Sequence, residues 1–199
     1  MSAGLSAAEF GIAAPPPESP HLDGGARWLN TTQPGAIDDI PHQLGLPQTG
    51  SQWLLWGGGA TPTRPNLRLQ ASAWTGGLQA SDKGGSSAWD LQLAELSLEQ
   101  GYPHGSLLVT GGAMLDHAEL YGALDGPGGS SRVRAPLWGG GFSAGLRWPR
   151  RTPLGFFVRG AYLWLQGTGD WRGDQATLLG RSKFDLGGTS LQGQVELKF

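Results

Sequence analysis

Cysteine is absent from the 199-residue chain, charge is scarce, and no long apolar run occurs. Without cysteine, the chain can form neither a disulfide framework nor a thiolate metal site. Charged residues make up 15% of the sequence, whereas an ordinary soluble domain has about 25%. Because no run of about 18 apolar residues is present, the sequence predicts no transmembrane helix. The first 20 residues lack the basic start and unbroken apolar stretch of a secretory signal peptide.

Nucleic acid, metal and cofactor binding find no support. The net charge is −2, and the pair Arg150 and Arg151 is too short for a nucleic-acid patch. No two histidines have metal-ligand spacing such as H-x-x-x-H. They are His21, His42, His104 and His117. We expect no nucleic-acid partner, no metal and no cofactor.

Glycine and tryptophan are abundant, with 35 and nine residues respectively. A glycine inside a helix weakens it by about 1 kcal/mol relative to alanine, so this glycine-rich chain is unsuited to a helical fold. No Gly-X-Y period is present, which excludes collagen. The composition therefore favours an all-β protein.

The chain divides into two parts. Residues 1–50 form a Pro-rich N-terminal arm, in which 36–40 favours the start of a short helix that Pro41 and Gly45 limit to a turn or two, and 27–31 favours a short strand. Residues 51–199 form the β-domain. Its strands are expected near 51–59, 66–75, 86–100, 106–122, 134–148, 154–166 and 189–199.

Apolar residues recur at every second position in three of these strands, which places them on one face. They are odd-numbered in 66–74 and 189–199 and even-numbered in 138–148. In 86–100 the phase changes between Leu93 and Leu96, which we interpret as a β-bulge near Ala94 and Glu95.

The connections between strands alternate in length. Segments 60–65, 101–105 and 149–153 are short and hold proline, whereas 76–85, 123–133 and 167–188 are long. In an up-and-down meander all short turns then lie at one end, as in outer-membrane barrels. With an eighth strand near 26–31 to give an even number, the sequence predicts an antiparallel up-and-down β-barrel of about eight strands.

The last nine residues, LQGQVELKF, resemble the final strand of small bacterial outer-membrane β-barrel proteins. Such strands end in an aromatic residue after alternating apolar positions. The resemblance implies an insertion signal read by the barrel-assembly machinery, with outer-membrane lipid around the barrel. That signal comprises Leu191, Val195, Leu197 and Phe199.

The spacing of aromatic residues fits such a membrane. Trp138 and Trp148 share a face ten residues apart, and at ~3.3 Å per residue this is roughly 33 Å along the strand. A tilt of about 40° reduces it to roughly 25 Å, the height of the apolar band between aromatic girdles. The same residues could instead fill a soluble core. The expected interface aromatics are Trp138, Trp148, Phe156, Trp164 and Phe199.

Charged residues also fall on strands. They could form a polar cluster inside the barrel or lie on a solvated sheet face, and the sequence leaves both open. The candidates are Arg68, Glu95, Arg147 and Arg159, with Glu99 on the same strand as Glu95.

Catalytic motifs are weak. Asp116, His117 and Glu119 are the one local acid–base grouping, but neighbouring strand residues point to opposite faces, so Asp116 and His117 cannot form a relay. The runs 57–59 and 139–141 are all glycine, but they lead into no helix and lack the Lys-Ser/Thr of a phosphate loop. They favour bending or close strand packing, and we expect no enzyme.

Three functions remain open. The first is a non-catalytic outer-membrane barrel at the cell surface, with a structural, adhesive or assembly role beside a larger surface protein or complex. The second is a soluble β-barrel or sandwich that binds an apolar ligand. The third is a β-subunit of a surface lattice or fibre that associates through exposed strand edges.

Overall fold

The computed structural model describes residues 20–31, 35–64, 67–149, 152–167, 172–173 and 184–199; residues 1–19 of the expected arm lie outside this set. The longer elements are β1 His21–Thr31, α1 Gly35–Gln43, β2 Gln52–Thr61, β4 Leu67–Asp82, β5 Gly85–His104, β6 Leu107–Gly126, β7 Gly129–Trp148, β8 Leu154–Gly167 and β11 Gly188–Lys198. Two-residue strands are β3 Thr63–Arg64, β9 Arg172–Gly173 and β10 Phe184–Asp185. Among the described residues, no helix is long and apolar enough to cross a bilayer.

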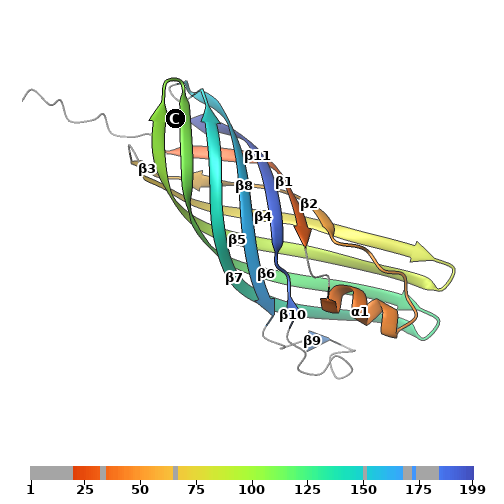
Figure 1. Ribbon diagram of the computed structural model, residues 1–199. Coiled ribbons are helices and arrows are strands. Elements are labelled where there is room, and N and C mark those ends of the chain that lie inside the picture. Colours follow the sequence, from red (N-terminus) through yellow and green to blue (C-terminus); the bar gives the residue numbers. More distant parts are fainter. Residues whose placement is uncertain (1–19, 32–34, 65–66, 150–151, 168–171, 174–183) are drawn as a thin grey trace, which may run out of the picture.

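The eight long strands close into an antiparallel ring in the order β1, β2, β4, β5, β6, β7, β8 and β11 (Figure 1). β11 pairs with β8 on one side and with β1 on the other, which closes the ring. The predicted all-β, up-and-down barrel is confirmed. The strand His21–Thr31, from the segment that we expected to be an arm, supplies the eighth member of the ring.

Strands β4 to β7 run further than their neighbours at the end of the barrel opposite the C-terminus (Figure 1). Pairing of β2 with β4 ends at Thr75, and pairing of β7 with β8 ends at Leu137. Beyond these points residues 76–91 and 120–136, which we name the extension, continue as paired strands. The loops predicted at 76–85 and 123–133 are therefore wrong, because strand continues to the tight turns around Gly84 and Gly128.

Local turn chemistry explains why these hairpins need no long loop. Asp82 Oδ1 accepts hydrogen bonds from the backbone N–H groups of Gly84 (2.7 Å) and Gly85 (3.2 Å), as in an Asx turn. Gly85 and Gly129, which begin the returning strands, have φ of 147° and 113°. A side chain at either position would be strained, so glycine permits each turn.

No bulge interrupts β5, and the predicted one near Ala94 and Glu95 is wrong. Residues Gly85–His104 pair one by one with β4 and β6. The apolar residues change face because their surroundings change along the strand. Leu91 and Leu93 are buried inside, whereas Leu96 and Leu98 are half exposed on the outer wall.

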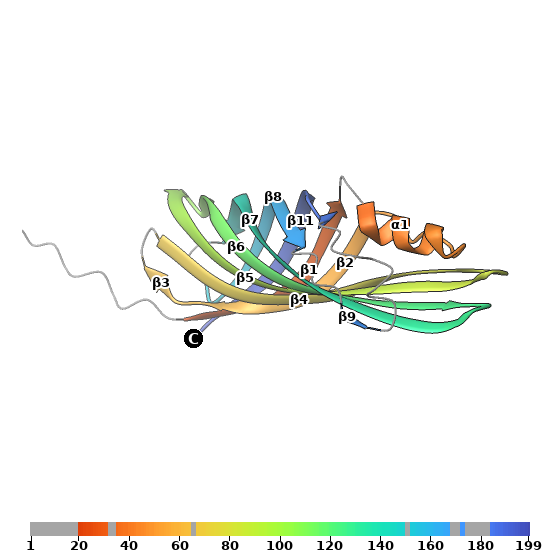
Figure 2. The ribbon, with the colours of Figure 1, turned by 90° about the horizontal axis from the view of Figure 1, so that it is seen from below.

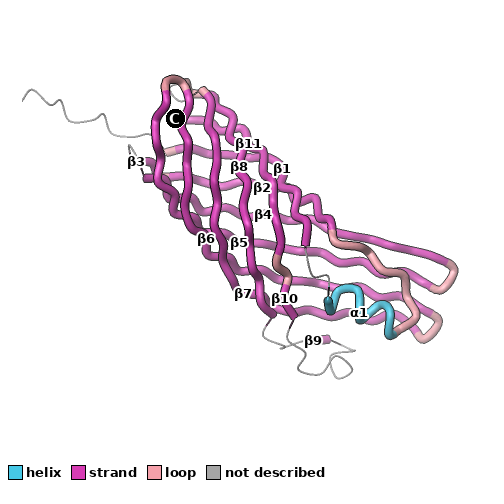
Figure 3. The backbone as a smooth tube through the Cα atoms, in the orientation of Figure 1, coloured by secondary structure: helices cyan, strands magenta, loops and turns pink. Residues whose placement is uncertain are grey.

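Helix α1 lies at the extension end of the barrel (Figures 2 and 3). Ile37 and Ile40 are buried in the apolar core. The helix is short, with Pro41 inside its last turn and Gly45 just beyond its end. The helix ends in a Schellman motif, in which Leu46 N–H donates to the Pro41 carbonyl (2.7 Å) and Gly45, at φ 69°, donates to His42 (3.1 Å).

Gly122 makes room for a tryptophan inside the extension. A Cβ at this position would stand 2.5 Å from the Trp89 ring and 2.7 Å from Val133. We expect Gly122→Val to lower the free energy of unfolding by about 1–3 kcal/mol through overpacking, measured by urea unfolding. Gly160→Val is the matched control, because its Cβ would meet nothing within 4 Å. Equal effects of the two substitutions would contradict the packing argument.

Candidate functional site

The outer wall of the barrel is apolar. Large apolar side chains are exposed on every long strand of the ring, from β1 to β11. They include Leu22, Trp28, Leu54, Trp56, Leu67, Leu69, Leu96, Leu98, Tyr102, Val109, Leu115, Phe142, Leu146, Leu154, Val158 and Tyr162. A surface of this kind is unusual on a soluble monomer, which rarely exposes contiguous apolar patches above a few hundred Å².

The aromatic residues predicted at the membrane interface all lie on this outer wall. Their exposed fractions range from 44% at Trp164 to 65% at Phe199. Trp138 pairs across to His117, and Trp148 pairs with Phe156 near the short-turn end. The apolar residues of the C-terminal segment point outward on β11 in the same way. They are Leu191, Val195 and Leu197.

Sequence reasoning missed several aromatics on this wall. Trp56 is exposed, whereas Trp53 on the same strand is buried, since positions three apart in a strand face opposite sides. The signal was present in β2, but the following glycines hid its alternation. Trp28, Tyr102 and Tyr162 are further outward-facing aromatics.

The interior of the barrel, its lumen, contains buried charged side chains. Glu95 is almost fully buried and accepts hydrogen bonds from Arg27 (2.7 Å) and from Arg159. Arg159 also donates to Glu99 (3.3 Å) and to the side-chain oxygen of Gln192 (2.7 Å). Two arginines and two glutamates from β1, β5 and β8 are thus connected across the barrel.

A second buried group lies nearer the short-turn end. Glu196 of β11 pairs with both Arg68 and Arg147. The guanidinium of Arg68 lies over the Phe157 ring, 4.1 Å from its centre. A buried carboxylate needs such partners, because an unpaired one in an apolar interior costs several kcal/mol.

The predicted polar cluster therefore lies inside the barrel, where the structure brings Arg159 to Glu95 and Arg147 and Arg68 to Glu196. Arg27 and Glu196 were absent from that prediction. Glu196 could have been found, because it lies on the polar face of the alternating last strand. Arg27 could not, since the single short strand around it showed no clear alternation.

Apolar side chains fill the lumen on the α1 side of these charges. Trp53, Trp74 and Trp89 are buried there with leucines of β5 to β8 and with Ile37 and Ile40 of α1. Ser87 also donates a hydrogen bond to the Pro47 carbonyl in the loop that follows the helix. Charged groups and apolar groups together occupy the interior.

The acid–base grouping is split between the two faces of β6. Asp116 is fully buried in the lumen, and neither carboxylate oxygen has a hydrogen-bond partner among the described residues. His117 and Glu119 face outward, with His117 Nε2 and Glu119 Oε1 3.9 Å apart. Asp116 and His117 therefore form no relay.

The glycine runs 57–59 and 139–141 lie within β2 and β7. A Cβ on Gly139 would stand 1.7 Å from the carbonyl oxygen of Trp164. Neither run leads into a helix, and at Gly139 the absence of a side chain allows close approach of the neighbouring strand.

Comparison with solved structures connects this geometry to known proteins. Neisserial surface protein A (NspA) superposes with a TM-score of 0.59 at 11% identity, over 90% of this chain and 97% of that chain. The chain has the fold of an outer-membrane β-barrel. The outer membrane protease OmpT from Escherichia coli gives a TM-score of 0.45 at 9% identity, over 92% of this chain and 98% of that chain, which is too distant to bear on chemistry. No protein-family model and no curated protein matches the sequence.

Proposed function

We propose that this protein is a small outer-membrane barrel with a filled lumen, no catalytic role, and an extension that serves structure, adhesion or assembly of a surface complex. One observation carries the proposal. The barrel is apolar outside, where Trp138 and Phe142 are more than half exposed, and charged inside, where Glu95 and Arg159 are at most 3% exposed. A protein folded in water has the reverse distribution.

The alternatives fit this distribution less well. A soluble carrier needs a polar outside and an apolar cavity with room for its ligand, whereas here ion pairs and tryptophans occupy the interior. A lattice or fibre subunit needs long free strand edges, whereas in the described residues the closed ring leaves only short edges, along the parts of β4 and β7 that form the extension. An apolar outer wall is favourable when lipid surrounds the barrel.

The outward-facing residues of β11 support the inferred insertion signal. Leu191, Val195, Leu197 and Phe199 are exposed on one face at the end of the chain, with Gly193 between the first two. A face of this kind is available to the barrel-assembly machinery before the ring closes. We infer the same orientation as in other barrels of this class, with short turns in the periplasm and the extension outside the cell.

Membrane insertion is tested by expressing the full chain with an export signal in a Gram-negative host. We expect it in the outer-membrane fraction, and we expect unheated and boiled samples to migrate differently on a denaturing gel. Brominated phospholipids should quench the outward-facing tryptophans of the folded protein in vesicles. A protein that stays monomeric in buffer without detergent would contradict the proposal.

The filled lumen gives a separate expectation. We expect the reconstituted barrel to show no ion conductance in a planar bilayer, because buried ion pairs and tryptophans occupy its interior. Steady single-channel currents from the folded, heat-modifiable protein would show that the lumen is open.

A further inference from the structure

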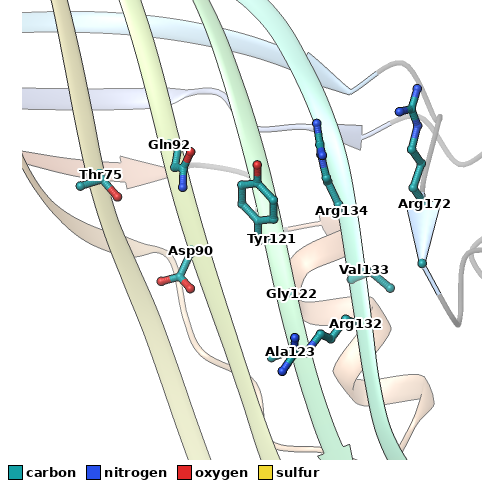
Figure 4. Close-up of a pocket in the computed structure, with 11 residues that line it drawn as sticks. Thr75, Asp90, Gln92, Tyr121, Gly122, Ala123, Arg132, Val133, Arg134 and Arg172 are labelled. Atoms are coloured by element: carbon teal, nitrogen blue, oxygen red, sulfur yellow. The ribbon is translucent and has the colours of Figure 1, made fainter.

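A groove of about 740 Å³ lies on the outer face of the extension. Its walls come from β4 to β7 and from β9. Figure 4 shows Tyr121 of β6 beside Arg134 of β7, with Arg172 of β9 reaching the same region. Gln92 and Asp90 of β5 line the groove from the other side.

The groove gathers like charge that the described residues neutralise only in part. Arg134 and Arg172 are directly paired across β7 and β9, and Arg132 lies two residues along β7. Like charges directly opposite on neighbouring strands are destabilising. Glu119 binds Arg134 through two hydrogen bonds (2.6 and 3.1 Å). Among the described residues no carboxylate pairs with Arg132 or Arg172.

Two acids moderate the charge without cancelling it. Asp90 lines the groove, and Glu119 is held by Arg134, so the described residues in and beside the groove include three arginines and two carboxylates. The hydrogen bond from Arg134 holds the pKa of Glu119 below its usual range, with a smaller contribution from nearby Arg172. Glu119 therefore stays ionised at neutral pH and competes with any anion for Arg134.

The groove lies beyond Trp138, the last outward-facing aromatic residue of β7 before the extension. Arg134 and Trp138 share the outer face of β7, and four residues correspond to ~13 Å along the strand. With Trp138 at the upper edge of the apolar band, the arginines lie at the height of lipid headgroups.

We propose that this groove binds the phosphate of a phosphorylated glycolipid in the outer leaflet, whose acyl chains lie along the wall below Trp138. The inference rests on the proposed membrane location. Guanidinium forks match phosphate oxygens two at a time. Arg134 is further fixed by the Tyr121 ring, 5.5 Å from the guanidinium carbon. A free phosphate would meet the same arginines but gain nothing from the apolar wall, which favours the lipid.

The test uses the full chain folded in detergent and titrated with bisphosphorylated lipid A, with bound lipid counted by native mass spectrometry. We expect saturable binding that weakens with salt. Arg134→Gln combined with Arg172→Gln should weaken it by at least about tenfold, since charged hydrogen bonds to phosphate are lost. Lys83→Gln is the matched control, because this exposed lysine lies in the β4–β5 turn outside the groove and should leave affinity unchanged.

A third variant moves affinity in the opposite direction. Glu119→Gln removes the carboxylate that competes for Arg134, so it should tighten lipid A binding. Equal binding of dephosphorylated lipid A would overturn the proposal, as would full affinity in the double arginine variant. Inorganic phosphate that binds as tightly as lipid A would also overturn it, since the lipid would then contribute nothing. Heat-modifiable migration of each variant verifies its fold.

The lipid experiment is independent of the membrane-location experiment. Failure of lipid A binding by a barrel found in the outer-membrane fraction would reject the groove alone. Absence from that fraction would reject the membrane location, whatever lipid A does in detergent.

Discussion

Replacement of Glu95 by glutamine is expected to lower the free energy of unfolding by about 3–5 kcal/mol, the range for breaking a buried ion pair. Glu95 is the carboxylate shared by Arg27 and Arg159, and the side chains in these ion pairs are at most 1% exposed. Without its charge, Arg27 is left in the lumen with no carboxylate partner among the described residues, because its one ion pair there is to Glu95. Arg159 keeps Glu99 at 3.3 Å and is less affected.

The measurement is urea unfolding of the refolded protein in vesicles, followed by the loss of heat-modifiable migration. Glu119→Gln serves as control, since it breaks an ion pair on the outer surface, where such pairs contribute little to stability. Adding Arg27→Met to Glu95→Gln should recover part of the lost stability, because the guanidinium without a partner is removed. Similar small effects of both single substitutions would show that the buried network does not stabilise the barrel.

The fold could be predicted from the sequence because the alternation of apolar residues and the spacing of the turns both indicate an up-and-down barrel. In the last ten residues Leu191, Val195, Leu197 and Phe199 are exposed, whereas Ser190, Gln192, Gln194 and Glu196 are buried. The sequence thus separated the two faces of the strand correctly. It could not tell which face was inside, since alternation is identical for a soluble sheet and for a membrane barrel.

The errors have one physical origin, which is that the polarity of both faces changes along a single strand. In β5, Trp89 and Leu91 face the interior near α1, whereas Leu96 and Leu98 face outward nearer the short turns. A regular strand that passes from one environment to the other changes the phase of its apolar residues. Sequence reasoning that assumes one environment reads this change as a bulge.

The same assumption concealed the extension. Residues 76–85 and 123–133 are rich in Gly, Ser and Asp, which usually indicate loops. Their outer faces are polar, as at Gln79 and Arg132, because this part of the sheet has left the apolar wall. The arginine groove was missed for this reason, since Arg132 and Arg134 fell at the edge of a supposed loop and Arg172 lay in another.

Because the outer wall is apolar, the effect of an added charge on stability depends on where the charge is placed. Ala144 faces outward on β7, close to midway between Trp138 and Trp148. In a bilayer, Ala144→Arg should therefore lower the free energy of unfolding by about 2–4 kcal/mol, the cost of an arginine near the midplane of a membrane barrel. Gln79→Arg adds the same charge on the exposed outer face of the extension and should change stability little. Both proteins are unfolded by urea from vesicles of one composition and compared with the unmodified chain. Two equal and small effects would mean that water, and not hydrocarbon, covers the wall around Ala144.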